Sequence, residues 1–157
     1  MPDAQQPLVL GPLDLSEPAT LTAAHRLGRA SYAVEAELIG FPDLPALRES
    51  EAELRARELT WLGARTPDGA LAGFLAWEET AVDRLCVDPA LFRRGVASRL
   101  LTAFLAHPGR PAGPLSLTTG AANAPAVALY TRFGFPRGAD LSPAPGLTLA
   151  AFTVPAR

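Results

Sequence analysis

The spacing of apolar and polar positions predicts four helices along the chain. Apolar residues recur at helical intervals over residues 18–38 and, most regularly, over residues 96–105, where they form a single stripe. A charged run of helix-forming residues predicts another helix over 46–57. Residues 123–135 predict the last one, with Asn123 as its N-cap and a glycine as its stop.

Strand-like segments alternate with these helices. Residues 58–66 and 70–79 flank a Pro-Asp-Gly turn signal and predict a β-hairpin. Further strands are expected within residues 7–15, 81–88, 115–120 and 146–154. The resulting order is strand, two helices, three strands, helix, strand, helix and one or more final strands. It predicts a mixed α/β (α+β) sheet covered by helices.

Length and composition narrow the class of protein. A chain of 157 residues predicts one domain over 1–157. No apolar run approaches the roughly 18 residues of a membrane span, so we expect no membrane association. Residues 1–10 lack a basic region followed by an apolar stretch, which argues against a signal peptide. Cys86 is the only cysteine, which excludes an internal disulfide and favours a cytoplasmic protein, and we expect no metal site.

Charge argues against one class of partner. The net charge is −2, and all basic residues are arginines, so no broad basic surface for nucleic acid is expected. A bound anion would need a local cluster, and Arg93–Arg94 is the one adjacent pair of arginines. This pair stands where the helix over 96–105 is expected to begin, with Gly95 in its first turn.

A helix start of this kind is unfavourable in isolation. Cations are disfavoured at a helix N-terminus, and glycine there costs roughly 0.5–1 kcal/mol relative to alanine. A bound pyrophosphate would reverse the clash, because helix N-terminal amides and guanidinium groups both bind phosphate. A solvated arginine pair is the alternative. Walker A and dinucleotide-binding patterns are absent, since the chain has no lysine and a single glycine here.

Two motifs resemble those of the GCN5-related N-acetyltransferase (GNAT) superfamily. "VDPALFRRGVASRLL" (87–101) resembles motif A, and "NAPAVALYTRFGF" (123–135) resembles motif B, in the expected order with a strand between them. The resemblance covers about residues 58–135. It departs at Phe92, where the family pattern usually has glutamine or arginine.

The resemblance implies a fold, a cofactor and its contacts. The fold would be a central, mostly antiparallel sheet flanked by about four helices, and the cofactor acetyl-CoA. Pantetheine would pair with a splayed strand at Leu85, Cys86 and Val87. Asn123 would hydrogen-bond near the pantetheine or acetyl end, beside Tyr130. The pyrophosphate would lie over Arg93, Arg94, Gly95, Val96, Ala97 and Ser98.

Acetyl transfer also needs an acid, because the departing thiolate benefits from a proton. The resemblance makes Tyr130 the candidate, since it occupies the tyrosine position of motif B and a phenol has a pKa close to that of a thiol. The alternative is that Tyr130 simply belongs to the core face of its helix. Cys86 is interpreted as a core residue of its strand and not as a nucleophile.

The base is less defined by the sequence. Some relatives carry a glutamate five residues before the motif B asparagine, where this chain has Thr118. Glu78 and Glu79 are alternatives, because strand side chains alternate and one of the two should face the cleft. A solvated strand end is the competing interpretation, and Asp83 or a chain of waters are other options for the base.

The acceptor side rests on the resemblance alone. Glu35 and Glu37 lie in the region that shapes the acceptor pocket in relatives, and would favour cationic amines unless they are surface charges. The sequence is therefore interpreted as an N-acetyltransferase that moves an acetyl group to a small-molecule or peptide primary amine. The oligomeric state stays open, and a homodimer is one option because dimers are frequent among relatives. Two alternatives stay open: a non-catalytic CoA or acyl-CoA sensor, and transfer of a longer acyl group.

Overall fold

The computed structural model describes residues 7–157. Residues 1–6, which bear on the predicted absence of a signal peptide, lie outside the described residues. The helices are α1 (Pro18–Ile39), α2 (Glu51–Ala56), α3 (Val96–Leu105) and α4 (Ala124–Arg132), with 3₁₀ turns η1 (Pro45–Leu47) and η2 (Pro89–Leu91). The strands are β1 (Val9–Pro12), β2 (Thr60–Arg65), β3 (Leu71–Trp77), β4 (Val82–Val87), β5 (Leu115–Gly120), β6 (Leu141–Ala144) and β7 (Leu147–Val154).

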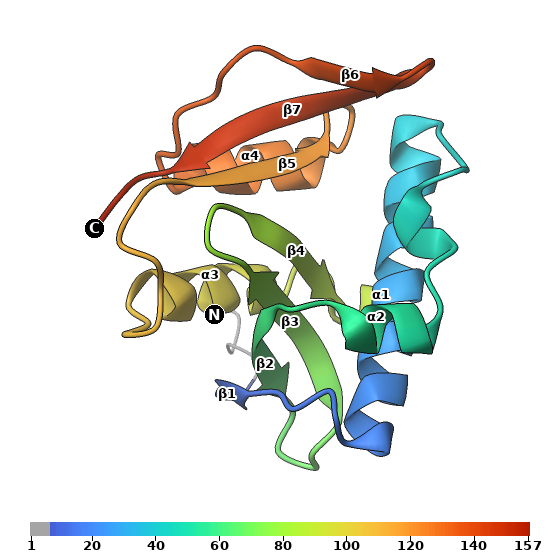
Figure 1. Cartoon of the computed structure of the whole chain (residues 1–157), viewed down its shortest axis with the longest axis vertical. Helices are drawn as coiled ribbons and strands as arrows, with labels where there is room; N and C mark the ends of the chain where they lie inside the picture. The colour runs from blue at the N-terminus through green and yellow to red at the C-terminus, as the bar shows by residue number, and fades with distance from the viewer. Residues whose placement is uncertain (1–6) are drawn as a thin grey trace, which may run out of the picture.

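The strands form two sheets that diverge from one another (Figure 1). The first has the order β1-β2-β3-β4 and the second β5-β7-β6, with antiparallel neighbours throughout. A single parallel bridge between Ala81 and Ser116 joins them, supported by a 2.9 Å hydrogen bond from the Ser116 amide to the Thr80 carbonyl. The expected mixed and mostly antiparallel sheet with flanking helices is confirmed.

Helices cover both faces of the first sheet. α1 and α2 pack on the face that carries Trp61, Phe74 and Cys86, while α3 packs on the opposite face against Leu75 (Figure 1). The predicted stripe of α3 is buried at Val96, Leu100, Leu101 and Phe104. The core on the α3 side continues into the second sheet and α4, so one apolar cluster is shared by both sheets. Beyond the Ala81–Ser116 bridge, β4 and β5 are not paired, and the space between these two strand segments is hereafter called the opening. The shared core holds the two sheets on either side of it.

Two elements differ from the sequence prediction. The helix expected over 46–57 is broken into η1 and α2, because Ser50 starts a new helix as its N-cap. Its hydroxyl accepts the Glu53 amide at 3.1 Å while the Glu53 carboxylate accepts the Ser50 amide at 3.2 Å, which is a capping box. β6 was not predicted as a separate strand: it is short, exposed and contains Pro143.

The helix of motif B has the predicted ends. Asn123 caps α4 by accepting the Ala126 amide at 3.3 Å. At the other end the Phe135 amide donates to the Tyr130 carbonyl, and the Gly134 amide donates to the Thr131 carbonyl, which is a Schellman motif.

Over residues 7–157 no helix, including the long helix α1, combines the length and the apolar character that a membrane span requires.

Candidate functional site

The opening between β4 and β5 brings the predicted site together. β4 is an edge strand of the first sheet, and beyond the Ala81 bridge no strand within residues 7–157 pairs with its free edge. Leu85, Cys86 and Val87 lie on this unpaired stretch. Across the opening, β5 ends at Gly120 and leads into the N-terminus of α4. The opening therefore has an unpaired strand edge on one side and a helix start on the other.

The turn after β4 corrects the predicted start of α3. The helix begins at Val96 and not at the arginines, and Gly95 is its N-cap, with a positive φ of 78°. Gly95 therefore carries no helix-interior cost, since its left-handed backbone is one that glycine adopts freely. Arg93 and Arg94 belong to the turn between η2 and α3. Arg93 is the one non-glycine residue with positive φ (65°) within residues 7–157.

This turn exposes a run of free backbone donors. Within the described part of the chain, none of the amide N–H groups from Arg93 to Ser98 donates to a protein acceptor. A Cβ at Gly95 would meet no atom within 4 Å, so the space beside the turn is open. Arg93 and Arg94 are exposed next to it. Consecutive amides, a helix N-terminus and two guanidinium groups together form an anion-binding arrangement.

A polar network links α1 to the end of β5. Oε1 of Glu35 accepts the Thr119 hydroxyl at 2.9 Å and the Gly120 amide at 3.0 Å. The Asn123 side-chain amide donates to the Thr119 hydroxyl oxygen at 3.3 Å. The close approach needs glycine at 120, because a Cβ there would collide with Ile39 at the end of α1. Glu35, expected to line the acceptor pocket, is thus held at the opening.

Tyr130 is 4% exposed and lies against the aromatic ring of Phe152, with centroids 5.3 Å apart. Burial raises the pKa of its phenol above the ordinary value, and the negative charge of Glu35 raises it further. The phenol therefore keeps its proton at neutral pH. The ring packs in the core, as one interpretation of the sequence expected, while the role of Tyr130 as an acid stays a prediction.

Cys86 is buried at 1% exposure on the face of β4 that contacts α1. Burial raises the pKa of its thiol from 9.0 to about 12, so the thiolate is not populated at neutral pH. The sequence interpretation of Cys86 as a core residue is confirmed. Tyr32 of α1 lies beside it, and burial followed by the charge of Cys86 raises the pKa of that phenol well above its usual range.

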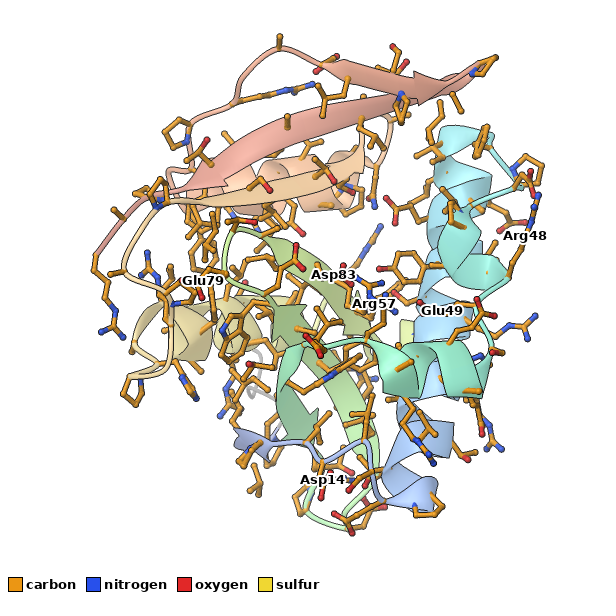
Figure 2. All side chains as sticks on the ribbon, in the orientation of Figure 1. Asp14, Arg48, Glu49, Arg57, Glu79 and Asp83 are labelled. Carbon is orange, nitrogen blue, oxygen red and sulfur yellow. The ribbon has the colours of Figure 1, made fainter. Side chains whose placement is uncertain are left out.

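An ion cluster that the sequence did not predict lies next to this opening. Arg84 on β4 is 8% exposed and donates to Glu49 at 2.9 Å and to Asp83 at 2.6 Å. Arg57 completes it through Asp83 at 2.5 Å, and Figure 2 shows Glu49, Arg57 and Asp83 pointing toward one another. Burial alone would lower the pKa of Arg84, but the bonds to Glu49 and Asp83 raise it, so the guanidinium stays charged. Residues 84 and 86 of a strand point to the same face, so the apolar Cys86 places Arg84 on a buried face. Since a buried arginine is almost always paired, the sequence could have indicated that Arg84 has an acidic partner.

The other acidic candidates, and the Thr118 position, supply no free carboxylate facing the opening. Glu78 and Glu79 lie after the end of β3, exposed in the turn to β4, so neither is a strand residue facing the cleft. Figure 2 shows Glu79 away from the group of Glu49, Arg57 and Asp83. Glu37 is exposed near the end of α1, and Thr118 is exposed on β5. Asp83, another candidate base, forms ion pairs with Arg57 and Arg84.

Comparison with known proteins identifies relatives over most of the chain. A model of the "Acetyltransferase (GNAT) family" matches residues 25–135. The UPF0157 protein YqkA of Bacillus subtilis (strain 168) is 34% identical over 126 residues, which cover 78% of this chain and 36% of that relative. The chain thus spans little more than a third of the length of this curated relative.

Solved structures show the same fold. The GCN5-related N-acetyltransferase "Aminotransferase, Class-II" of Rhodopseudomonas palustris superposes with a TM-score of 0.76 at 20% identity, covering 98% of both chains. The ribosomal-protein-S18-alanine N-acetyltransferase of Escherichia coli gives 0.68 at 22% identity, covering 96% of this chain and 94% of that one. YncA of Salmonella typhimurium, solved with its cofactor acetyl-CoA, gives 0.65 at 16% identity, covering 94% and 93%.

Proposed function

Because the chain belongs to the acetyltransferase (GNAT) family, we propose that it transfers an acetyl group from acetyl-CoA directly to a primary amine. Family and fold support acyl transfer from an acyl-CoA. The observation that carries the finer proposal is the run of unpaired amides from Arg93 to Ser98 beside the unpaired edge of β4. The whole of residues 1–157 is proposed to act as one domain.

The residues of the turn suit the diphosphate of coenzyme A. A pyrophosphate requires several donors in one place, and the six consecutive amides supply them without side chains. Phe92 therefore need not be a phosphate ligand, although relatives place a polar residue there. Arg93 or Arg94 adds a guanidinium donor. The free edge of β4 at Leu85–Val87 is proposed to pair with the amide groups of pantetheine.

Asn123 and Tyr130 are proposed to act at the acetyl end. One N–H of the Asn123 amide is used by Thr119, and the second remains for the cofactor. Tyr130 is proposed to donate its phenolic proton to the departing thiolate sulfur. A backbone amide of the splayed strand is proposed to stabilise the oxyanion of the tetrahedral intermediate.

The experiment is a pair of measurements on the purified protein. Acetyl-CoA should raise the melting temperature, since a ligand at 100 times its Kd stabilises by about 2.7 kcal/mol. A panel of primary amines should then release free CoA thiol in the presence of acetyl-CoA. A protein that acetyl-CoA at millimolar concentration neither binds nor stabilises would contradict the proposal at its first step.

One observation favours a second candidate function. Thr118 stands where some relatives carry a glutamate, which suits a module that senses CoA or an acyl-CoA without catalysis. Such a module would be stabilised by acetyl-CoA yet release no CoA with any amine. Competition between acetyl-CoA and longer acyl-CoAs tests the further alternative of a longer acyl group.

A further inference from the structure

Glu35 combines two features that a purely structural residue would not need. Its Oε1 is fully engaged, since it accepts both the Thr119 hydroxyl and the Gly120 amide. Its Oε2 accepts no hydrogen bond from any residue within 7–157. One oxygen therefore fixes the carboxylate across the end of the opening, and the other is left for a molecule that enters it.

The Glu35 carboxylate has no counter-ion among residues 7–157. The guanidinium group of Arg84, which like Glu35 interacts with Tyr32 and Cys86, is already bound to Glu49 and Asp83. A partly buried charge without a counter-ion is costly, and a bound cation would offset that cost.

The other acidic groups that face Glu35 hold their protons. Tyr32 on α1, Cys86 on β4 and Tyr130 on α4 all interact with its charge. Burial raises the pKa of each of them, so at neutral pH they are uncharged. None of these three groups can therefore receive a proton from a ligand.

From these contacts we infer that Glu35 binds the ammonium group of a cationic acceptor amine through Oε2 and takes its proton, with Thr119 as the residue that positions it. This inference rests on the proposed function and names its acceptor class: primary amines that are protonated and carry no neighbouring carboxylate. It also moves the base from the strand position of Thr118 to helix α1. Thr119, the next residue on that strand, holds the carboxylate in place.

The protons balance over one turnover. The ammonium gives one proton to the Glu35 carboxylate, which passes it to water, and the freed lone pair attacks the thioester carbon. The new C–N bond forms and the C–S bond breaks, with the electron pair leaving on sulfur. Sulfur takes the Tyr130 proton, and the second nitrogen proton restores that phenol. The net products are the amide, CoA thiol and one proton.

Glu35→Gln separates this role from a structural one. The amide oxygen of glutamine still accepts the Thr119 and Gly120 donors, so the melting temperature and acetyl-CoA affinity should stay near wild type. With tyramine, spermidine or lysine amide as the probe, kcat/KM should fall roughly 10²-fold or more, the usual contribution of a proton-transfer group. The loss should be smaller with hydroxylamine, which is largely neutral at pH 7.

Thr119 offers a second pair of variants. Thr119→Val removes one of the two donors to Oε1 and should lower kcat by about tenfold, the value of a hydrogen bond to a charged group. Thr119→Ser keeps the hydroxyl and should restore most of the activity. Glu58→Gln, an exposed carboxylate in the loop before β2, should leave kcat/KM unchanged. Glu37→Gln should have a smaller effect than Glu35→Gln.

The outcomes distinguish this inference from the proposed function. Equal kcat/KM for Glu35→Gln and wild type with all three cationic probes overturns it, as does a loss of the same size for Glu37→Gln. A wild type that binds acetyl-CoA but acetylates none of the three probes also overturns it while leaving the cofactor proposal standing. A wild type that does not bind acetyl-CoA contradicts the proposed function itself.

Discussion

Arg84 and Glu49, 35 residues apart in sequence, form a 2.9 Å ion pair whose side chains are only 8% and 15% exposed. The pair fastens the segment before α2 to strand β4. The guanidinium also lies 5.9 Å from the centre of the Trp61 ring, which adds a cation–π contact. His25 of α1 donates to the Glu49 carbonyl at 2.7 Å, so helix α1, this segment and β4 meet at one point.

Removing one partner of this pair should be costly. Glu49→Gln leaves the buried Arg84 with fewer compensating charges, and we expect the free energy of unfolding to fall by about 3 kcal/mol. Urea denaturation measures the change. Arg48→Gln is the matched control, because its ion pair with Asp43 is 68% and 59% exposed and should contribute less than about 1 kcal/mol. Equal losses for the two variants would mean that burial of the cluster has no energetic consequence.

Tyr130→Phe tests the acid. The variant keeps the ring contacts with Phe135 and Phe152, so stability and acetyl-CoA affinity should change little. The rate of acetyl transfer should fall by about 10²-fold or more, because the departing thiolate loses its proton donor. Stopped-assay measurement of CoA release against amine concentration separates kcat from KM. A variant with wild-type kcat would assign Tyr130 to the core alone.

Gly95→Ala tests the anion-binding turn. Its Cβ would meet nothing within 4 Å, so the cost comes from the left-handed φ of 78° and amounts to about 1–2 kcal/mol. Because the turn carries the free amides, acetyl-CoA affinity should fall by about tenfold in calorimetric titration. Gly113→Ala, also in open space and without a positive φ, is the control. Phe92→Gln should change affinity less than Gly95→Ala, and the reverse order would contradict the assignment of the turn.

Cys86 predicts a dependence of stability on alkaline pH. Burial raises the pKa of its thiol from 9.0 to about 12, so above pH 9 the unfolded chain releases a proton that the native protein keeps. The free energy of unfolding should then fall as pH rises, by up to about 1.4 kcal/mol per pH unit, whereas below pH 9 this contribution is fully present. Tyr32 and Tyr130 add the same trend only above about pH 10.

The Cys86→Ala variant isolates this contribution. Urea denaturation of both proteins at about pH 8, 9 and 10 should show a shallower decline for the variant, whatever its absolute stability. A decline of the same steepness in both would show that other groups govern the alkaline loss of stability.

Local sequence signals predicted most of the fold. Asn123 and Gly134 mark both ends of α4, and the stripe from Val96 fixes the buried face of α3. The start of α3 was misplaced because a glycine preceding a helix can be its N-cap or its first turn, and only the positive φ decides. The break at Ser50 was visible in principle, since serine followed three residues later by glutamate is a capping box.

The site was less predictable, because its contacts join residues far apart in the chain. Glu35 and Thr119 are hydrogen-bonded although 84 positions separate them in the sequence, and no local sequence pattern predicts such a contact. The resemblance assigned Glu35 and Glu37 to one region without distinguishing them, whereas in the structure Glu35 contacts β5 and Glu37 is exposed. The sequence predicted that Glu78 and Glu79 continue the strand, but β3 ends at Trp77, where the register with β4 shifts.

The single backbone bridge between the sheets has a consequence for cooperativity. Because Ala81 and Ser116 form the only β-bridge between the two sheets in the described part of the chain, their association depends on the core that α3, α4 and both sheets share. Because one apolar cluster runs through α3, α4 and both sheets, the two sheets should melt in one calorimetric transition. A ligand that contacts both sheets in the opening should therefore raise the free energy of unfolding of the whole domain, and not only that of one sheet.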